Sequence, residues 1–127
     1  MPRTAVQPDG LVVPKPAYSP VVISQDLVYT SGQVGKDISG SFVSDEIVGQ
    51  ARKALANVGA CLEAAGCGFE DVLKVSTFLA NNADFGAYDQ VYREFFDAPF
   101  PARTTVAVDF DDGTLIEIDA VARKSQL

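Results

Sequence analysis

The chain has 127 residues, of which 47% are hydrophobic and 21% are charged. These are the proportions of a globular protein, and the length predicts one domain over residues 1–127. Ten basic against seventeen acidic residues give a formal net charge of −7. A chain this acidic lacks the basic track that nucleic acids and anionic membrane surfaces require, so we expect neither as a partner.

The chain contains no histidine, which excludes the commonest general base and every triad that relays protons through imidazole. Cys61 and Cys67 have no further thiol or imidazole to complete a zinc site, so we expect no metal. We interpret both as small, buried or half-buried side chains rather than a redox pair. The sequence starts without a signal-peptide segment, and no apolar run could span a membrane, which favours a cytoplasmic protein.

The N-terminal region is predicted to be irregular and then to form a hairpin. Five of the seven prolines lie in residues 1–20, so we expect extended or irregular structure there. Two β-rich runs, 20–24 and 27–34, flank Gln25 and Asp26 and predict a pair of antiparallel strands.

A long helix is predicted next. Ser44, followed by two acidic residues, is typical of a helix start, and Gly66 is typical of a helix end. Between them, apolar residues recur at spacings of three and four, which predicts one buried stripe. Its members are Val48, Ala51, Leu55, Val58, Leu62 and Ala65.

Three strands and a second helix are predicted in the C-terminal half. A β-branched run predicts a strand over 72–80, and aromatic residues at helical spacing predict a helix over 84–96. Two more strands are expected over 104–110 and 115–123, joined as a hairpin through the turn at 111–113. The resulting order is β-β-α-β-α-β-β, an α+β fold.

Two helices can cover only one face of such a sheet, so the other face meets solvent or another chain. We expect the apolar sets of the last two strands under the helices and the mixed sets against a neighbouring subunit. The apolar sets are Val106, Val108, Phe110, Ile116, Ile118, Ala120 and Ala122. The mixed sets are Thr105, Ala107, Asp109, Leu115, Glu117, Asp119 and Val121, with Phe78 beside them.

Arg103 and Glu117 are the candidates for chemistry. Arg103 follows a proline-bounded turn, and an arginine in a cleft indicates an anionic small molecule, because its planar fork matches a carboxylate. The alternative is a surface salt bridge. Glu117 and Asp119 project from one strand face, either as an acid–base pair or as a solvated face. Partial burial would raise the pKa of Glu117 towards values useful for proton transfer.

Several short motifs occur in order along nearly the whole chain. They are Tyr18 in the proline-rich segment, TSGQ at 30–33, QARKALANV at 50–58, AAG at 64–66, FPAR at 100–103 and IEIDA at 116–120. With these motifs the chain resembles the YjgF/RidA family of reactive intermediate deaminases, also called the endoribonuclease L-PSP family.

The resemblance implies a chorismate-mutase-like fold assembled as a homotrimer, with sites between subunits. It also implies a cofactor-free hydrolysis of enamines and imines of 2-amino acids, such as 2-aminoacrylate and 2-iminopropionate, to 2-keto acids and ammonia. By position, Arg103 would bind the substrate carboxylate, Glu117 would position and help activate water, and Tyr18 and Ser31 would line the pocket.

The sequence departs from the common family pattern at three places, two of them in the implied substrate-binding site. Thr105 stands where a cysteine is common, and Asp89 stands where an asparagine is frequent. Pro16 and Ala17 precede Tyr18 where Gly-Pro is usual. A deaminase of a different imine in a catabolic pathway therefore fits as well.

Two alternatives belong to other functional classes. Some family members are described as endoribonucleases, but the charge of −7 and the absence of histidine oppose RNA binding and cleavage here. A non-catalytic trimer, acting as a small-ligand-binding regulator or a chaperone, is the second. Turnover distinguishes a deaminase from such a binder.

Overall fold

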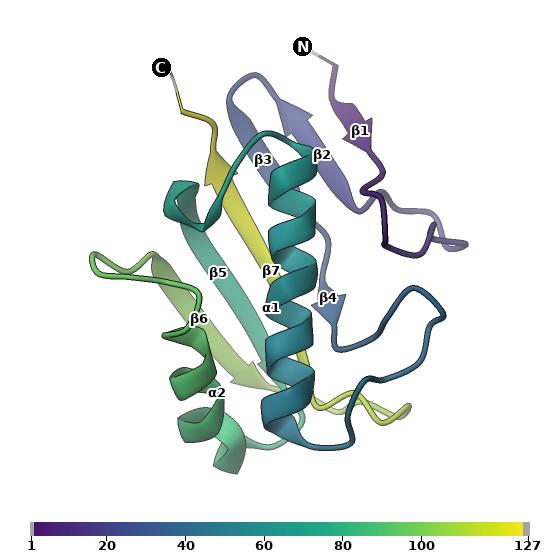
Figure 1. The fold of residues 1–127 in the computed structure, drawn as a ribbon, viewed down its shortest axis with the longest axis vertical. Coiled ribbons are helices and arrows are strands. Elements are labelled where there is room, and N and C mark those ends of the chain that lie inside the picture. Colours follow the sequence, from purple (N-terminus) through teal and green to yellow (C-terminus); the bar gives the residue numbers. More distant parts are fainter. Residues whose placement is uncertain (1, 126–127) are drawn as a thin grey trace.

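One mixed sheet carries two helices on the same face (Figure 1), which confirms the predicted α+β class. The computed structural model describes residues 2–125. The strands are β1 (Thr4–Val6), β2 (Val21–Ser24), β3 (Leu27–Thr30), β4 (Gln33–Val34), β5 (Val72–Leu79), β6 (Ala102–Ala107) and β7 (Ile116–Arg123). The helices are α1 (Ile47–Ala64) and α2 (Phe85–Tyr92), with 3-10 turns at Phe69–Asp71 and Asn82–Asp84. No helix among the described residues is long and apolar enough to cross a membrane.

The predicted hairpin between the last two strands is wrong. The sheet order is β1-β2-β3-β7-β5-β6, with β4 also pairing with β7. Strand β7 has antiparallel neighbours on both sides, so β6 pairs instead with the outer edge of β5, in parallel. The local turn is nevertheless present, because Gly113 has a φ of 93° and Thr114 donates its N–H to Asp112. The residues at 111–113 predict only the local turn. The partner of β6 depends instead on which strand of the sheet has a free edge.

Element boundaries differ from the expected ones at several places. The proline-rich segment contains the short strand β1, which pairs with β2. The run over 27–34 is divided into β3 and β4 at Ser31 and Gly32. Helix α1 begins at Ile47, although Ser44 still accepts the N–H of Glu46. Helix α2 ends at Tyr92, four residues before the expected end.

The hydrophobic core lies between the helices and the sheet. It confirms the apolar face of β7 and the predicted stripe of α1 except at Val48, which is 38% exposed. Leu55, Val58 and Leu62 are fully buried, as are Ile116 and Ile118. Cys61 is also fully buried and Cys67 partly so, as the sequence predicted. Burial raises the pKa of the Cys61 thiol to about 12, which makes it unreactive near neutral pH.

The predicted faces of β6 are inverted. Val106 pairs with Phe78 on the open face of the sheet and is 42% exposed. Thr105 pairs instead with Thr77, which is buried against α2. Because β6 is an edge strand, few core contacts select its apolar side, and the parallel register with β5 decides. Arg103 and Thr105 therefore lie on the helix face, and Glu117 lies on the open face.

Candidate active site

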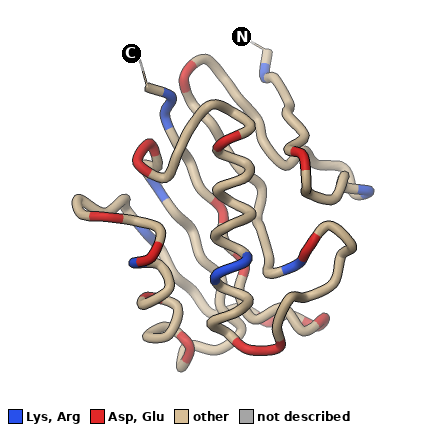
Figure 2. The backbone as a smooth tube through the Cα atoms, in the orientation of Figure 1, with Lys and Arg blue, Asp and Glu red and all other residues tan. Residues whose placement is uncertain are grey.

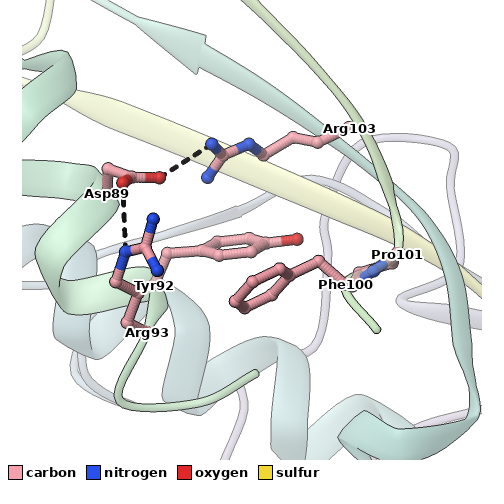
Figure 3. Close-up of a pocket in the computed structure, with 6 residues that line it drawn as sticks. All are labelled: Asp89, Tyr92, Arg93, Phe100, Pro101 and Arg103. Atoms are coloured by element: carbon pink, nitrogen blue, oxygen red, sulfur yellow. Dashed lines mark hydrogen bonds and ion pairs between the residues drawn. The ribbon is translucent and has the colours of Figure 1, made fainter. Parts of the chain in front are cut away.

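Arg103 is held in a fixed position between α2 and the start of β6 (Figure 3). Its NH2 group donates to Asp89 Oδ1 at 2.8 Å, and its side chain is only 21% exposed. The guanidinium lies over three aromatic rings of α2, at 4.3 Å from the centroid of Tyr92, 5.2 Å from Phe85 and 5.4 Å from Tyr88. A cation over several aromatic faces is attracted by their quadrupoles. The aromatic stripe of α2 is thus both core and support for this arginine.

Asp89 links two arginines. Besides Arg103, its Oδ2 accepts from Nε of Arg93, one helical turn further on, at 3.3 Å. The hydrogen bond from Arg103 is the main reason that the pKa of Asp89 is below its ordinary value of 3.8. Asp89 is therefore ionised at neutral pH. The spacing of four residues between Asp89 and Arg93 is a helix-pair signal that sequence reasoning did not use for the site.

Two buried polar atoms beside this ion pair have no hydrogen-bond partner among the described residues. They are NH1 of Arg103 and the hydroxyl of Tyr92. A buried charged donor without an acceptor is costly. Both residues line a pocket of about 290 Å³, together with Asp89, Arg93, Phe100 and Pro101 (Figure 3). The Arg103 guanidinium thus forms part of the pocket wall, while its NH1 is itself buried.

Thr105 lies on the same face of β6 as Arg103, two residues along the strand. It is half-buried, and its partner across the sheet, Thr77, makes a buried hydrogen bond with the hydroxyl of Tyr88. We call Arg103, Asp89 and Thr105 the arginine half-site. The structure places these three sequence-predicted residues at one edge of the molecule.

Glu117 lies on the other face of the sheet, in β7 between β4 and β5. It pairs with Val34 on one side and Phe78 on the other, and it is half-buried. Burial raises its pKa above the ordinary value of 4.5, and the charges of Asp119 and Asp112 add to the effect. Gly32 lies directly against the carboxyl group, since a Cβ at this position would overlap with Oε2 of Glu117. At the TSGQ motif, the missing side chain of Gly32 leaves room for the Glu117 carboxyl group.

Ser31 and Tyr18 lie near Gly32, which is in contact with Glu117. The Ser31 hydroxyl donates to the carbonyl of Ser19 at 2.6 Å, and its N–H donates to the carbonyl of Pro20 at 2.8 Å. These bonds fix the proline-rich segment beside the TSGQ motif. Tyr18, which is 54% exposed, lines a pocket there with Gly32. We call Glu117, Tyr18 and Ser31 the glutamate half-site.

The two half-sites do not meet within one chain, because one lies on the helix face of β6 and the other on the open face around β7. Neither contains a metal-binding cluster: no group of three or more His, Cys, Asp or Glu side chains placed for a metal occurs within residues 2–125. The acidic positions are spread over the fold, and the basic positions of the described chain form no continuous track (Figure 2). A complete site of the kind expected from the sequence needs both half-sites.

Comparison with known proteins decides the family. Residues 11–124 match the family described as Endoribonuclease L-PSP. The chain belongs to this family. The resemblance to YjgF/RidA proteins that the sequence motifs indicated is thereby confirmed.

Individual members of the L-PSP family are similar over most of their length. The 2-iminobutanoate/2-iminopropanoate deaminase of Homo sapiens is 40% identical over 112 residues, which cover 87% of this chain and 82% of that protein. A RutC family protein of Pyrococcus horikoshii is 38% identical over 115 residues, with 87% and 91% covered. The crystal structure of E. coli TdcF with bound serine superposes with a TM-score of 0.89 at 30% identity, covering 96% of this chain and 99% of TdcF.

Proposed function

We propose that this chain is an imine deaminase, which hydrolyses reactive imines and enamines of 2-amino acids to 2-keto compounds and ammonia without a cofactor. Relatives about 40% identical over most of the chain carry the name 2-iminobutanoate/2-iminopropanoate deaminase, which supports this reaction class. The structural observation that supports it most is Arg103, a rigidly held guanidinium whose buried NH1 has no acceptor in the described chain. The family description as an endoribonuclease is opposed by the charge of −7 and the lack of histidine.

The proposed active site forms between neighbouring subunits of a homotrimer. Arg103 and Thr105 on one subunit would face Glu117, Tyr18 and Ser31 on the next. The open sheet face supports this assembly because it carries apolar side chains that the helices do not cover. They are Tyr29 next to Val121, and Phe78 next to Val106. Such a face is characteristic of a surface between subunits.

In the proposed reaction, Arg103 orients the substrate and Glu117 moves protons. The imine carbon is already electrophilic, so orientation of substrate and water provides much of the catalysis. Glu117 accepts a proton from water as the oxygen bonds to the imine carbon, while the imine nitrogen takes up a proton. The carbon–nitrogen bond of this carbinolamine then breaks as Glu117 returns its proton to the leaving nitrogen. The hydroxyl proton is released to solvent and replaces the proton that the imine nitrogen took from solvent, so the products are a carbonyl and ammonia. An enamine enters the same route after protonation at carbon.

The direct test is imine hydrolysis, with imines produced in situ by an amino acid oxidase from small and bulky amino acids. We expect the wild-type protein to accelerate release of the keto acid and Arg103→Ala to lose at least a hundredfold in kcat/KM. If a folded wild-type protein bound keto acids, seen as a raised Tm, but accelerated no imine, it would be a binder and not a deaminase.

A further inference from the structure

Arg93 is a second arginine at the wall of the pocket that contains Arg103 (Figure 3). Its Nε donates to Oδ2 of Asp89 at 3.3 Å, and its guanidinium carbon lies 5.5 Å from the ring centroid of Phe100. The two contacts come from different segments, since Asp89 is in α2 and Phe100 precedes β6. Together they hold this guanidinium at the pocket wall.

The terminal nitrogens of Arg93 are available to a ligand. Neither makes a hydrogen bond within residues 2–125, where the side chain of Arg93 donates only through Nε. The side chain is also 57% exposed, so a ligand can reach it. The planar fork of an arginine can bind a carboxylate through two parallel hydrogen bonds. Arg93 can therefore bind a carboxylate and keep its contact with Asp89.

The lining of the pocket is cationic, although the whole chain has a net charge of −7. Its charged members are two arginines, Arg93 and Arg103, and one acid, Asp89. Asp89 lies between the two guanidiniums, and each of its oxygens accepts from one of them. A ligand carboxylate at each arginine would complete a row of alternating charges, in which every carboxylate is nearest to a guanidinium. Such an order is favourable, because attraction between neighbours exceeds repulsion between the more distant like charges.

The two arginines suit a ligand with two anionic ends. Part of the Arg103 side chain, which is 21% exposed, faces the pocket and would hold the carboxylate beside the imine carbon. Arg93 is then left for another group of the same substrate. Because a single carboxylate bridges the two guanidiniums, their ligand groups would lie only a few atoms apart. This is the spacing of the two carboxylates in a short dicarboxylic acid.

We propose that Arg93 is a specificity-determining residue, which binds a second carboxylate of the substrate while Arg103 binds the first. The substrate class is then the imines of short 2-amino dicarboxylic acids, which react with water to give 2-keto dicarboxylic acids and ammonia. This inference rests on the proposed deaminase function and specifies which imines the site selects.

The test uses product analogues in two pairs, and the members of a pair differ in one end group, a carboxylate or a methyl group. The pairs are oxaloacetate with 2-oxobutanoate and 2-oxoglutarate with 2-oxopentanoate. We expect the wild-type protein at pH 7 to bind the dicarboxylate of at least one pair tenfold more tightly or better. Arg93→Gln should reduce this ratio of dissociation constants at least fivefold, and Arg93→Lys, which keeps the charge, should retain most of it. Arg103→Ala should weaken both members of the pair.

The matched control is Arg52→Gln, which removes the same charge from an arginine of similar exposure, 51%, that is paired with Glu94 on the surface. It should leave the ratio unchanged, because Arg52 does not line the pocket. An equal fall of the ratio in Arg52→Gln and Arg93→Gln would overturn the inference, since net charge alone would then account for the preference.

Two further results would overturn the inference. One is the absence of a dicarboxylate preference in both pairs, or a preference that Arg93→Gln leaves unchanged. The other is equal weakening of both members of a pair by Arg93→Gln, because Arg93 would then only position Asp89 and Arg103. These failures are separable from failure of the proposed function. Arg103-dependent imine hydrolysis with an unchanged ratio refutes the role of Arg93 alone, whereas a shifted ratio without hydrolysis of any imine refutes the deaminase alone.

Discussion

At the scale of single residues, the environment of Arg103 favours its charged form, whereas the environment of Glu117 disfavours its charged form. Aromatic rings and Asp89 stabilise the charge of Arg103, so it remains a cation at any pH that the fold survives. Burial and neighbouring carboxylates disfavour the charge of Glu117. A group whose pKa is raised towards neutrality exchanges protons more readily near neutral pH. Arg103 is thus permanently charged, whereas Glu117 can gain and lose a proton.

The pH dependence of hydrolysis should report Glu117. The proposed mechanism needs its carboxylate form, and its pKa is raised above 4.5. We therefore expect kcat/KM to be full at neutral pH and to fall about tenfold per pH unit below that raised pKa. Glu117→Gln should remove activity by a hundredfold or more, and Glu46→Gln, at the exposed start of α1, should keep the wild-type profile. A Glu117→Gln variant with wild-type rate would refute the assigned role.

The sequence identified these residues singly but not their relation. The prolines before Arg103 singled out that residue. Glu117 was singled out by its position between two isoleucines of a predicted strand. Their positions on opposite sheet faces depend on the parallel pairing of β6 with β5, which no local pattern encodes. The Asp89–Arg103 contact depends in turn on how α2 packs beside β6. Pairwise geometry of this kind needs the tertiary structure.

At the scale of elements, Gln50 joins three segments and is 1% exposed. From the first part of α1, its NH₂ group donates to the carbonyls of Ser44 and Gly113, and its carbonyl accepts the N–H of Leu115. This one side chain fixes α1 to the loop that precedes β7. It thereby helps to set where the strand that carries Glu117 begins.

Replacement of Gln50 should destabilise the fold. Gln50→Leu fills a similar volume but leaves the Leu115 N–H and two carbonyls without this partner, so we expect a loss of about 2–4 kcal/mol in the free energy of unfolding. Urea denaturation followed by circular dichroism measures it. The control is Arg52→Gln, which breaks an exposed salt bridge with Glu94 and should lower the free energy of unfolding much less. Equal losses in both variants would contradict the proposed role of Gln50.

Element types were predictable where periodicity is strong and tertiary pairing does not intervene. The stripe of α1 from Ala51 onwards and the alternation of β7 gave the correct buried faces because these segments pack against the core. The edge strand β6 was assigned to the wrong partner and the wrong face. Its nearest turn signal, at Gly113, describes a local bend and carries no information about sheet order.

At the scale of the whole molecule, the open sheet face determines the assembly that we propose. Val106, 42% exposed on this face, should be buried in the trimer. We expect a trimer of about three times 13.5 kDa by analytical ultracentrifugation, and Val106→Asp should shift it to monomers. Val48→Asp on α1, a position 38% exposed, should leave the trimer intact. A wild-type monomer, or equal dissociation by both variants, would contradict the proposed interface.

The most direct measurement of the central claim is complementation between two inactive variants. Arg103→Ala and Glu117→Gln chains are co-expressed with different tags, purified together and assayed for imine hydrolysis. If each site takes Arg103 from one subunit and Glu117 from the next, every mixed trimer has one intact site, and random mixing at equal expression restores about a quarter of the wild-type activity per chain. If the mixed protein remains as inactive as either variant alone, the two residues do not act together across subunits, and the proposed active site is wrong.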